Sequence, residues 1–100
     1  MSVAEQAERV RLAAGAELVR SQRALRSVGL SWSEPELIVW KHAASEYTAE
    51  LRVQFYHGKD LVDVFEFIVC DGGALTVSEV EVCRWIQDNV PDVVRRRTQS

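Results

Sequence analysis

The sequence predicts an α+β fold in the order α-β-β-β-α, in which a three-stranded antiparallel meander packs with an N-terminal and a C-terminal helix. Two capped segments with helical spacing of apolar residues frame the chain. Between them, residues 46–70 form two strand-like runs around a turn that contains glycine. The 100 residues are expected to form a single domain, 1–100, with a disordered tail from about residue 95.

The first predicted element is a helix over about Val3–Ser27. Ser2 and Glu5 match a capping box, which satisfies two backbone N–H groups at a helix start. The apolar residues with helical spacing form one stripe: Ala7, Val10, Ala14, Leu18, Leu25 and Val28. Gly29 is the expected stop, because glycine readily adopts the left-handed conformation that ends many helices.

Residues 30–36 form a connector, and the segment after it is compatible with either a helix or a strand. Ser33-Glu34-Pro35-Glu36 matches a helix start. The run Leu-Ile-Val-Trp at 37–40 favours a strand, since β-branched and aromatic residues suit a pleated sheet. We predict a strand at Leu37–His42, because the next strand already claims the residues from Glu46 onward and leaves little room for a helix.

The segment Glu46–Cys70 is predicted to be a long antiparallel β-hairpin. Its first strand alternates between apolar and polar residues, which is typical of a half-buried strand. Gly58 in the first central position of the turn favours a two-residue loop. That register would place Leu51 opposite Glu66, so that this carboxylate would lie on an apolar face with a raised pKa unless it is paired.

A three-residue loop is the alternative register for the hairpin. It would set Arg52 opposite Glu66 as a cross-strand ion pair and would move Phe65 and Phe67 to the apolar face of the first strand. In either register the second strand has apolar side chains on both faces, and both faces need cover. Since 100 residues offer limited material for that, the pattern favours a partner, with a second copy of this chain as the first hypothesis.

The second predicted helix comes after a turn at Asp71-Gly72-Gly73. Thr76 and Glu79 match a second capping box and predict a helix over about Val77–Asn89. Pro91 is expected to bend or end this helix, because proline has no backbone N–H to donate. Its apolar face is wide: Val77, Val80, Val82, Cys83, Trp85, Ile86 and Val90.

Composition and charge exclude several classes of protein. No apolar run approaches the ~20 residues that span a bilayer, and charged residues interrupt the first stretch before a signal peptide can form. The net charge is −3, with +2 on residues 1–30, −8 on residues 31–94 and +3 on residues 95–100. An acidic chain without a dominant basic face does not favour nucleic acid. We therefore expect a soluble, cytoplasmic protein with no membrane or nucleic-acid partner.

No motif indicates a metal or cofactor, and none is predicted. Cys70 and Cys83 match no zinc spacing and are expected to be free thiols. His57 lies beside Asp60 at the predicted turn, where a local hydrogen bond is the simplest role. The sequence shows no nucleophile arrangement, nucleotide-binding loop or EF-hand.

Candidate site residues are suggested by the surplus of apolar surface and by the aromatic residues. The interface candidates are Leu61, Phe65, Phe67, Val69 and Tyr56. The candidates for a ligand pocket between helix and sheet are Glu66, Trp40, Trp85 and Tyr47. No catalytic residue is assigned.

These features predict a small binding protein that self-associates, as a dimer, through an apolar sheet face or through the exposed side of the first helix. An adaptor, inhibitor or immunity-like factor would act in this way, with another protein as a further partner. The alternative is a small-molecule-binding protein with an aromatic pocket. A weaker alternative is an enzyme that uses Glu66, Asp63 or His57.

Overall fold

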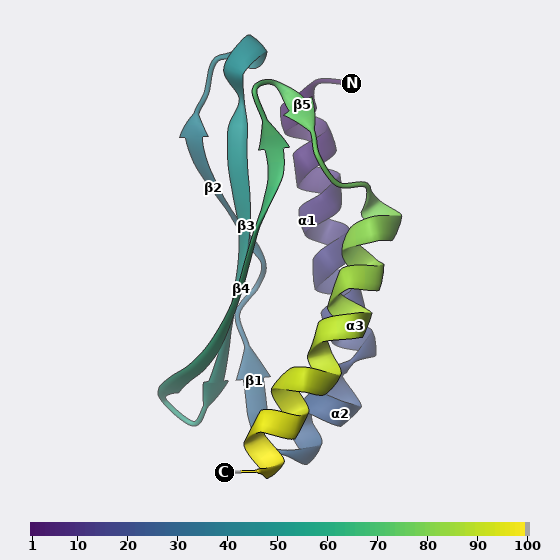
Figure 1. The fold of residues 1–100 in the computed structure, drawn as a ribbon, viewed down its shortest axis with the longest axis vertical. Coiled ribbons are helices and arrows are strands. Elements are labelled where there is room, and N and C mark those ends of the chain that lie inside the picture. Colours follow the sequence, from purple (N-terminus) through teal and green to yellow (C-terminus); the bar gives the residue numbers. More distant parts are fainter. Residues whose placement is uncertain (100) are drawn as a thin grey trace.

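The computed structural model describes residues 1–99 as two layers (Figure 1). Helices α1 (Val3–Arg20) and α3 (Glu79–Thr98) lie side by side on one face of a curled antiparallel sheet, and the short α2 (Gln22–Ser27) comes directly after α1. The sheet consists of β1 (Leu30–Trp32), β2 (Glu36–Lys41), β3 (Thr48–His57), β4 (Asp60–Asp71) and β5 (Ala74–Leu75), with a 3₁₀ turn, η1, at Ala44–Glu46. The predicted α+β class, with a helix before and after an antiparallel meander, is confirmed.

Helix α1 begins as the sequence predicts. Ser2 Oγ accepts a hydrogen bond from the backbone N–H of Glu5 at 3.1 Å, and the Glu5 carboxylate accepts one from the backbone N–H of Ser2. The predicted single helix over Val3–Ser27 is two helices, because the chain leaves helical geometry at Ser21. The Ser21 hydroxyl donates to the Glu17 carbonyl at 3.0 Å, a local bond that often bends helices.

The segment predicted as a connector contains strand β1. This strand pairs with the His57 end of β3, and β2 pairs with the Thr48 end, so that both line the same edge of β3. Three residues are too few to show alternation, and β1 therefore has no signal in the sequence. The preference for a strand over a helix at 37–42 is confirmed by β2.

The hairpin combines the two registers that the sequence leaves open. The turn is the two-residue loop, since His57 pairs with Asp60. A β-bulge at Val62 then shifts the pairing by one residue. Beyond the bulge Arg52 lies opposite Glu66, as in the alternative register. From Asp63 to Ile68 this extra residue reverses the faces that the loop length alone would assign, and a second irregularity at Val69 restores them at Cys70.

The bulge decides which side chains of β4 are buried. Phe65 turns toward the helices and contacts Phe55 and Trp85 at ring-centroid distances of 4.6 and 4.9 Å. Phe67 also stacks on Trp85, at 4.5 Å. Phe65 is 6% exposed and Val69 is fully buried. These residues belong to the core of a single chain, which corrects the expectation that the 61–69 stretch leaves them for a partner.

Helix α3 begins two residues later than predicted. Its capping box is Ser78 with Glu81, in place of the predicted Thr76 with Glu79. Thr76 is engaged in the sheet instead: its backbone N–H donates to the Val69 carbonyl at 2.8 Å, and its hydroxyl donates to a neighbouring carbonyl of β4. A residue that extends a sheet edge is not free to cap a helix.

The same helix continues through Pro91 to Thr98, so its predicted end at Asn89 is wrong. Proline removes one helical hydrogen bond, but Val90 and Val93 beside it are buried in the core. Burial of that face holds the helix together on both sides of the proline, whose own ring is exposed. The expected disordered tail is likewise wrong for residues 95–98, and residue 100 lies outside the described residues.

The packing of the helical layer on the sheet determines which faces of the molecule are exposed. The buried side chains of β3 face the helices: Ala49, Leu51, Val53 and Phe55. Within the described chain, no helix covers the outer face of the sheet (Figure 1). Helices α1 and α3 run in the same direction along an elongated molecule of 44 × 24 × 17 Å, so that their C-terminal ends lie toward the same end of it. Among residues 1–99, no helix is long and apolar enough to cross a membrane.

Candidate interaction site

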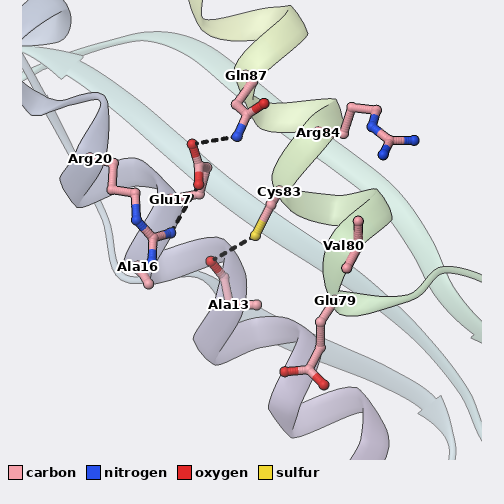
Figure 2. Close-up of a pocket in the computed structure, with 9 residues that line it drawn as sticks. All are labelled: Ala13, Ala16, Glu17, Arg20, Glu79, Val80, Cys83, Arg84 and Gln87. Carbon is pink, nitrogen blue, oxygen red and sulfur yellow. Dashed lines mark hydrogen bonds and ion pairs between the residues drawn. The ribbon is translucent and has the colours of Figure 1, made fainter.

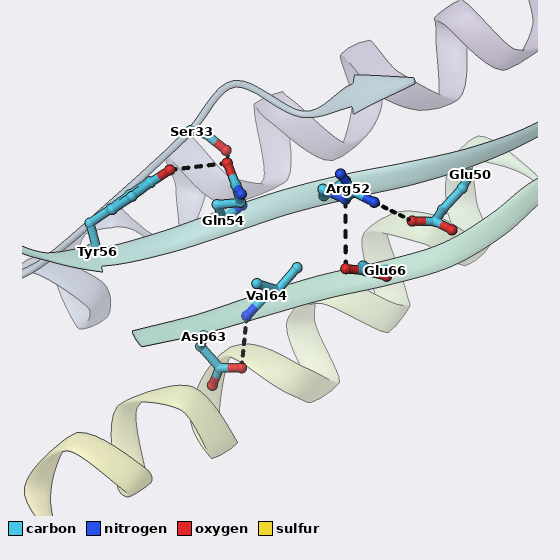
Figure 3. A network of polar contacts seen from close by, with 8 residues as sticks. All are labelled: Ser33, Glu50, Arg52, Gln54, Tyr56, Asp63, Val64 and Glu66. Atoms are coloured by element: carbon cyan, nitrogen blue, oxygen red, sulfur yellow. Dashed lines mark hydrogen bonds and ion pairs between the residues drawn. The ribbon is translucent and has the colours of Figure 1, made fainter. Parts of the chain in front are cut away.

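The outer face of the sheet has a polar network along β3. Arg52 Nη2 lies 3.4 Å from Glu50 Oε1, and Arg52 Nε lies 3.6 Å from Glu66 Oε1 (Figure 3). The Tyr56 hydroxyl donates to Gln54 Oε1 at 3.0 Å. Glu50 in this network is only 7% exposed, whereas 34% of the Arg52 side chain and 49% of the Glu66 side chain are exposed.

Apolar side chains flank this network on the neighbouring strands. Leu61 is 51% exposed and Ile68 is 38% exposed, and both lie on the outer face of β4. Trp40, near the end of β2, is 58% exposed. Of the predicted interface residues, only Leu61 and Tyr56 lie on this face. Because the centre of the face is charged, it lacks the apolar centre that is common in protein interfaces.

The four predicted pocket residues do not line one cavity. Glu66 lies on the outer face of the sheet, with 49% of its side chain exposed, whereas Trp85 stacks against the inner face. Trp40 is exposed, and Tyr47 is only 8% exposed. Burial raises the pKa of the Tyr47 hydroxyl. The space between helix and sheet is filled by the aliphatic and aromatic side chains of the core.

The three residues considered for catalysis also lie apart. Asp63 pairs with Arg96 of α3, with the Arg96 Nε 3.1 Å from the Asp63 carboxylate, on the inner side of the sheet. Glu66 lies on the opposite face, and His57 lies at the hairpin turn. Within residues 1–99, no group of three or more His, Cys, Asp or Glu side chains is placed to hold a metal ion.

A cleft of about 560 Å³ opens between α1 and α3 (Figure 2). Four of the residues that line it have short side chains, Ala13, Ala16, Val80 and Cys83, and the others are charged or polar: Glu17, Arg20, Glu79, Arg84 and Gln87. At one end lies Glu17, which is only 5% exposed. Its two carboxylate oxygens accept hydrogen bonds from Gln87 Nε2 and Arg20 Nη1, each at 3.0 Å. These bonds satisfy the buried carboxylate, and the one from Gln87 joins the two helices.

Both cysteines are free, as the sequence predicts. Cys83 Sγ donates to the Ala13 carbonyl at 3.6 Å, across the cleft. Burial raises the pKa of the Cys83 thiol, and burial also raises the pKa of the Cys70 thiol inside the core. Both thiols therefore stay protonated near neutral pH, and protonated thiols are poor nucleophiles.

The exposed side of α1 beside the cleft has an aliphatic stripe. Leu12 is 57% exposed and Val19 is 54% exposed, with the exposed Ala16 between them. Residues at i, i+4 and i+7 share one face of a helix. Val80 of α3, which is 65% exposed, lines the neighbouring cleft. We call these four residues, Leu12, Ala16, Val19 and Val80, the helical patch.

Charges of opposite sign lie at the two ends of the helical patch. Glu5 and Glu8 are exposed toward the N-terminal end of α1 beside the exposed Arg9, and Arg20 and Arg23 are exposed toward its C-terminal end. This order also suits the helix dipole. Glu8 accepts a hydrogen bond from Arg11 Nε at 2.9 Å, which lowers the pKa of the Glu8 carboxyl. The patch is thus an apolar centre between an end of mixed charge and a basic end.

Sequence reasoning named the exposed side of the first helix and placed Val80 on the wide apolar face of the second, but it named none of Leu12, Ala16 and Val19. The available signal was the position of Leu12 and Val19, which lie outside the core stripe of that helix. A helix with apolar residues on a second face indicates a second contact surface.

Comparisons with protein-family models, with curated proteins and with solved structures found no match to this chain. The residues and their geometry are therefore the basis for inferring its function.

Proposed function

We propose that this chain is a small binding protein that self-associates through the helical patch. The observation that supports this proposal is the exposure of Leu12, Val19 and Val80, each more than half exposed. Leu12 and Val19 flank Ala16 on α1, and Val80 lines the cleft that Ala16 also lines. A fully buried aliphatic side chain of this size contributes about 1.5–3 kcal/mol, and much of that is forgone while these three lie in water. Apolar patches with a polar rim are typical of interaction surfaces.

A second copy of the chain is the partner that the charges favour. The exposed charges at the two ends of the helical patch are Glu5, Glu8 and Arg9 at one end and Arg20 and Arg23 at the other. A symmetric dimer uses the same patch twice, so another copy offers a carboxylate to each arginine of the first. Complementary charges around an apolar centre provide orientation and specificity.

The outer face of the sheet is a weaker candidate for this contact. Phe65 and Val69 are buried in the core, and Phe67 faces the helices. What remains is a charged centre, in which Glu50 and Arg52 already pair with each other. Glu50 is already buried, but covering that centre with a second copy would remove the partly exposed Arg52 and Glu66 from water, and this desolvation cost can exceed the gain from pairing.

In this proposal the chain acts by contact and not by catalysis, which suits an adaptor, an inhibitor or an immunity-like factor. The second candidate function is the binding of a small molecule in the cleft between α1 and α3. Its volume of about 560 Å³ lies within the range of small-molecule sites. The residues that line the cleft include no aromatic side chain, so this would not be the aromatic pocket predicted from the sequence.

Sedimentation equilibrium over a range of protein concentrations tests the proposal. We expect a monomer–dimer equilibrium for the natural chain. Leu12→Glu should weaken the dimer by about tenfold or more, because each copy then buries a charge at the contact. Leu61→Glu is the matched control, since Leu61 has a similar exposure (51% against 57%) on the opposite layer. Circular dichroism checks that both variants fold.

A mass that stays monomeric at every concentration would reject self-association. A dimer lost in Leu61→Glu and retained in Leu12→Glu would move the contact to the sheet face. Thermal stabilisation of the monomer by a small molecule, abolished by Ala16→Trp in the cleft wall, would favour the second candidate function instead.

A further inference from the structure

We infer that the groove between α1 and the connector from β1 to β2, residues 33–35, binds an acidic and apolar segment of a partner protein. This inference goes beyond the proposed self-association, because it adds a partner of different chemistry. The groove includes Leu12 and Val19 of the helical patch, so the partner segment would compete with a second copy for α1.

The groove lies on the other side of α1 from the cleft beside α3. Leu12 and Val19 line it from α1, and Trp32 and Pro35 line it from β1 and the connector. Pro35 closes its floor by covering Gly15, since a Cβ at position 15 would lie 3.6 Å from Pro35 Cδ. The side chains around the groove are thus mainly apolar, with an indole ring among them.

The dimensions of the groove suit a peptide segment better than a whole small molecule. Its volume of about 240 Å³ lies below the roughly 300–1,000 Å³ of small-molecule sites. Leu12 and Val19 nevertheless lie seven residues apart, which is about 10 Å along a helix. A small groove of that length accepts a row of side chains from one segment.

The groove is preformed, because hydrogen bonds hold the connector at both of its ends. Arg11 Nη1 donates to the Pro35 carbonyl at 3.1 Å, which ties the connector to α1. The backbone N–H of Ser33 donates to the Gln54 carbonyl, and Ser33 Oγ accepts from the backbone N–H of Gln54, each at 2.9 Å. A preformed site loses less conformational entropy when a partner binds.

The end of the groove beside α2 is basic. Residues 18–33 contain three arginines and no aspartate or glutamate. The Arg26 guanidinium lies 5.9 Å from the ring centroid of Trp32. Arg23 and Arg26 are exposed, and neither forms an ion pair with an Asp or Glu of residues 1–99. A guanidinium can stack on an aromatic ring and bind a carboxylate through two parallel hydrogen bonds, so these two arginines favour an acidic partner.

The opposite end of the groove gives the bound segment a direction. There Arg11 is paired with Glu8, and Glu34 also lines the groove, so this end attracts no further acid. The acidic residues of the segment are therefore expected beside α2, and its apolar residues between α1 and Trp32. Single-stranded nucleic acid fits less well, because phosphates and bases make no use of aliphatic walls.

Selection from a phage-displayed library of random peptides, with the natural chain as the target, tests the chemistry of the segment. We expect the selected peptides to share acidic residues next to leucine or aromatic residues. Isothermal titration calorimetry then measures the affinity of the best peptide for each variant. Arg23→Glu and Arg26→Glu should each weaken it by about tenfold or more, since the reversal opposes like charges. Arg84→Glu, which reverses an exposed arginine in the cleft on the other side of α1, is the matched control and should change the affinity by less than about twofold.

Trp32→Ala tests the apolar part of the contact. It should weaken peptide binding by about 30-fold, the loss typical of a tryptophan at the centre of an interface. Circular dichroism checks that this variant folds, because Trp32 also packs against the core. The variants of the exposed arginines decide the inference if Trp32→Ala does not fold.

The absence of acidic and apolar peptides among those selected would overturn the inference, and so would a peptide that binds both arginine variants as tightly as the natural chain. Tighter binding of a single-stranded DNA oligonucleotide, lost in the same variants, would replace the segment with nucleic acid. Sedimentation separates this inference from the proposed function. A chain that stays monomeric and binds the peptide would reject self-association alone. A chain that dimerises, but binds no selected peptide while dilute and monomeric, would reject the groove alone.

Discussion

The position of Phe65 on the inner face of β4 makes a sharp prediction about stability. Phe65 is 6% exposed and makes edge-on contacts with Phe55 and Trp85, whereas Leu61 in the same strand is 51% exposed on the outer face. Without the bulge at Val62, both residues would lie on the same face of β4. Truncating each of them to alanine therefore tests the bulge directly.

The expected losses in free energy of unfolding differ severalfold between Phe65→Ala and Leu61→Ala. Removal of a buried phenylalanine side chain costs about 3–5 kcal/mol, because burial is lost and a cavity remains. Leu61→Ala should cost about 1 kcal/mol or less, since half of that side chain is already in water. A domain of this size is stable by about 5–15 kcal/mol, so Phe65→Ala should remain folded with a strongly reduced melting temperature. At about 4–8 °C per kcal/mol, the decrease is roughly 12–40 °C.

Urea denaturation followed by far-ultraviolet circular dichroism measures both costs. This signal avoids the fluorescence of Trp85, which the Phe65→Ala substitution would itself change. Similar slopes of free energy against urea concentration in both variants would show that the denatured states are comparable. If the two variants lost the same free energy of unfolding within about 0.5 kcal/mol, the assigned faces of β4 would be refuted.

Two further predictions concern the start of α3 and the pH dependence of stability. Ser78→Ala should lower the free energy of unfolding by about 1 kcal/mol through loss of the N-cap, as measured in urea; an unchanged value would dismiss Ser78 as the cap. Stability should fall as the pH rises above 9.0, the ordinary pKa of a thiol, because burial raises the pKa of Cys70 in the folded chain only. The folded chain then binds the proton more tightly than the unfolded chain, so this contribution is full below that pH and is lost above it. Cys70→Ala should flatten the dependence in denaturation at about pH 8 to 10, and a stability that rises over this interval would contradict the assignment.

Local patterns predicted the parts of the fold that depend on local chemistry. The capping box of Ser2 and Glu5 starts α1 where expected, because capping uses residues only three positions apart. The β-rich run after Pro35 forms a strand, and the turn at Gly58 has the expected two-residue loop. Each of these features is set by neighbours in the sequence.

Features that depend on distant contacts were not predicted. Thr76 resembles a helix cap, but the β4 carbonyls beside it bind its N–H and hydroxyl instead. Pro91 resembles a helix end, but the buried Val90 and Val93 carry the helix past it. Strand β1 is defined by its partner in β3 and not by its own three residues. In each case a tertiary contact outweighs a local preference.

In the candidate site, too, some features depend on spacing along the chain and others on tertiary packing. The helical spacing of α1 determines that Leu12, Ala16 and Val19 share one face and lie between acidic and basic residues. Only the packing of α3 and the sheet decides that this face stays in water while the stripe containing Val10 and Leu18 is covered.

The sequence by itself determined the order of the two long helices and the hairpin strands, the cap of α1 and the apolar faces of each helix, since these depend on spacing along the chain. The tertiary structure decided which face of β4 is buried. The physical reason is that side chains alternate with a period of two, so that one bulged residue exchanges the two faces without any change in the pattern of the sequence.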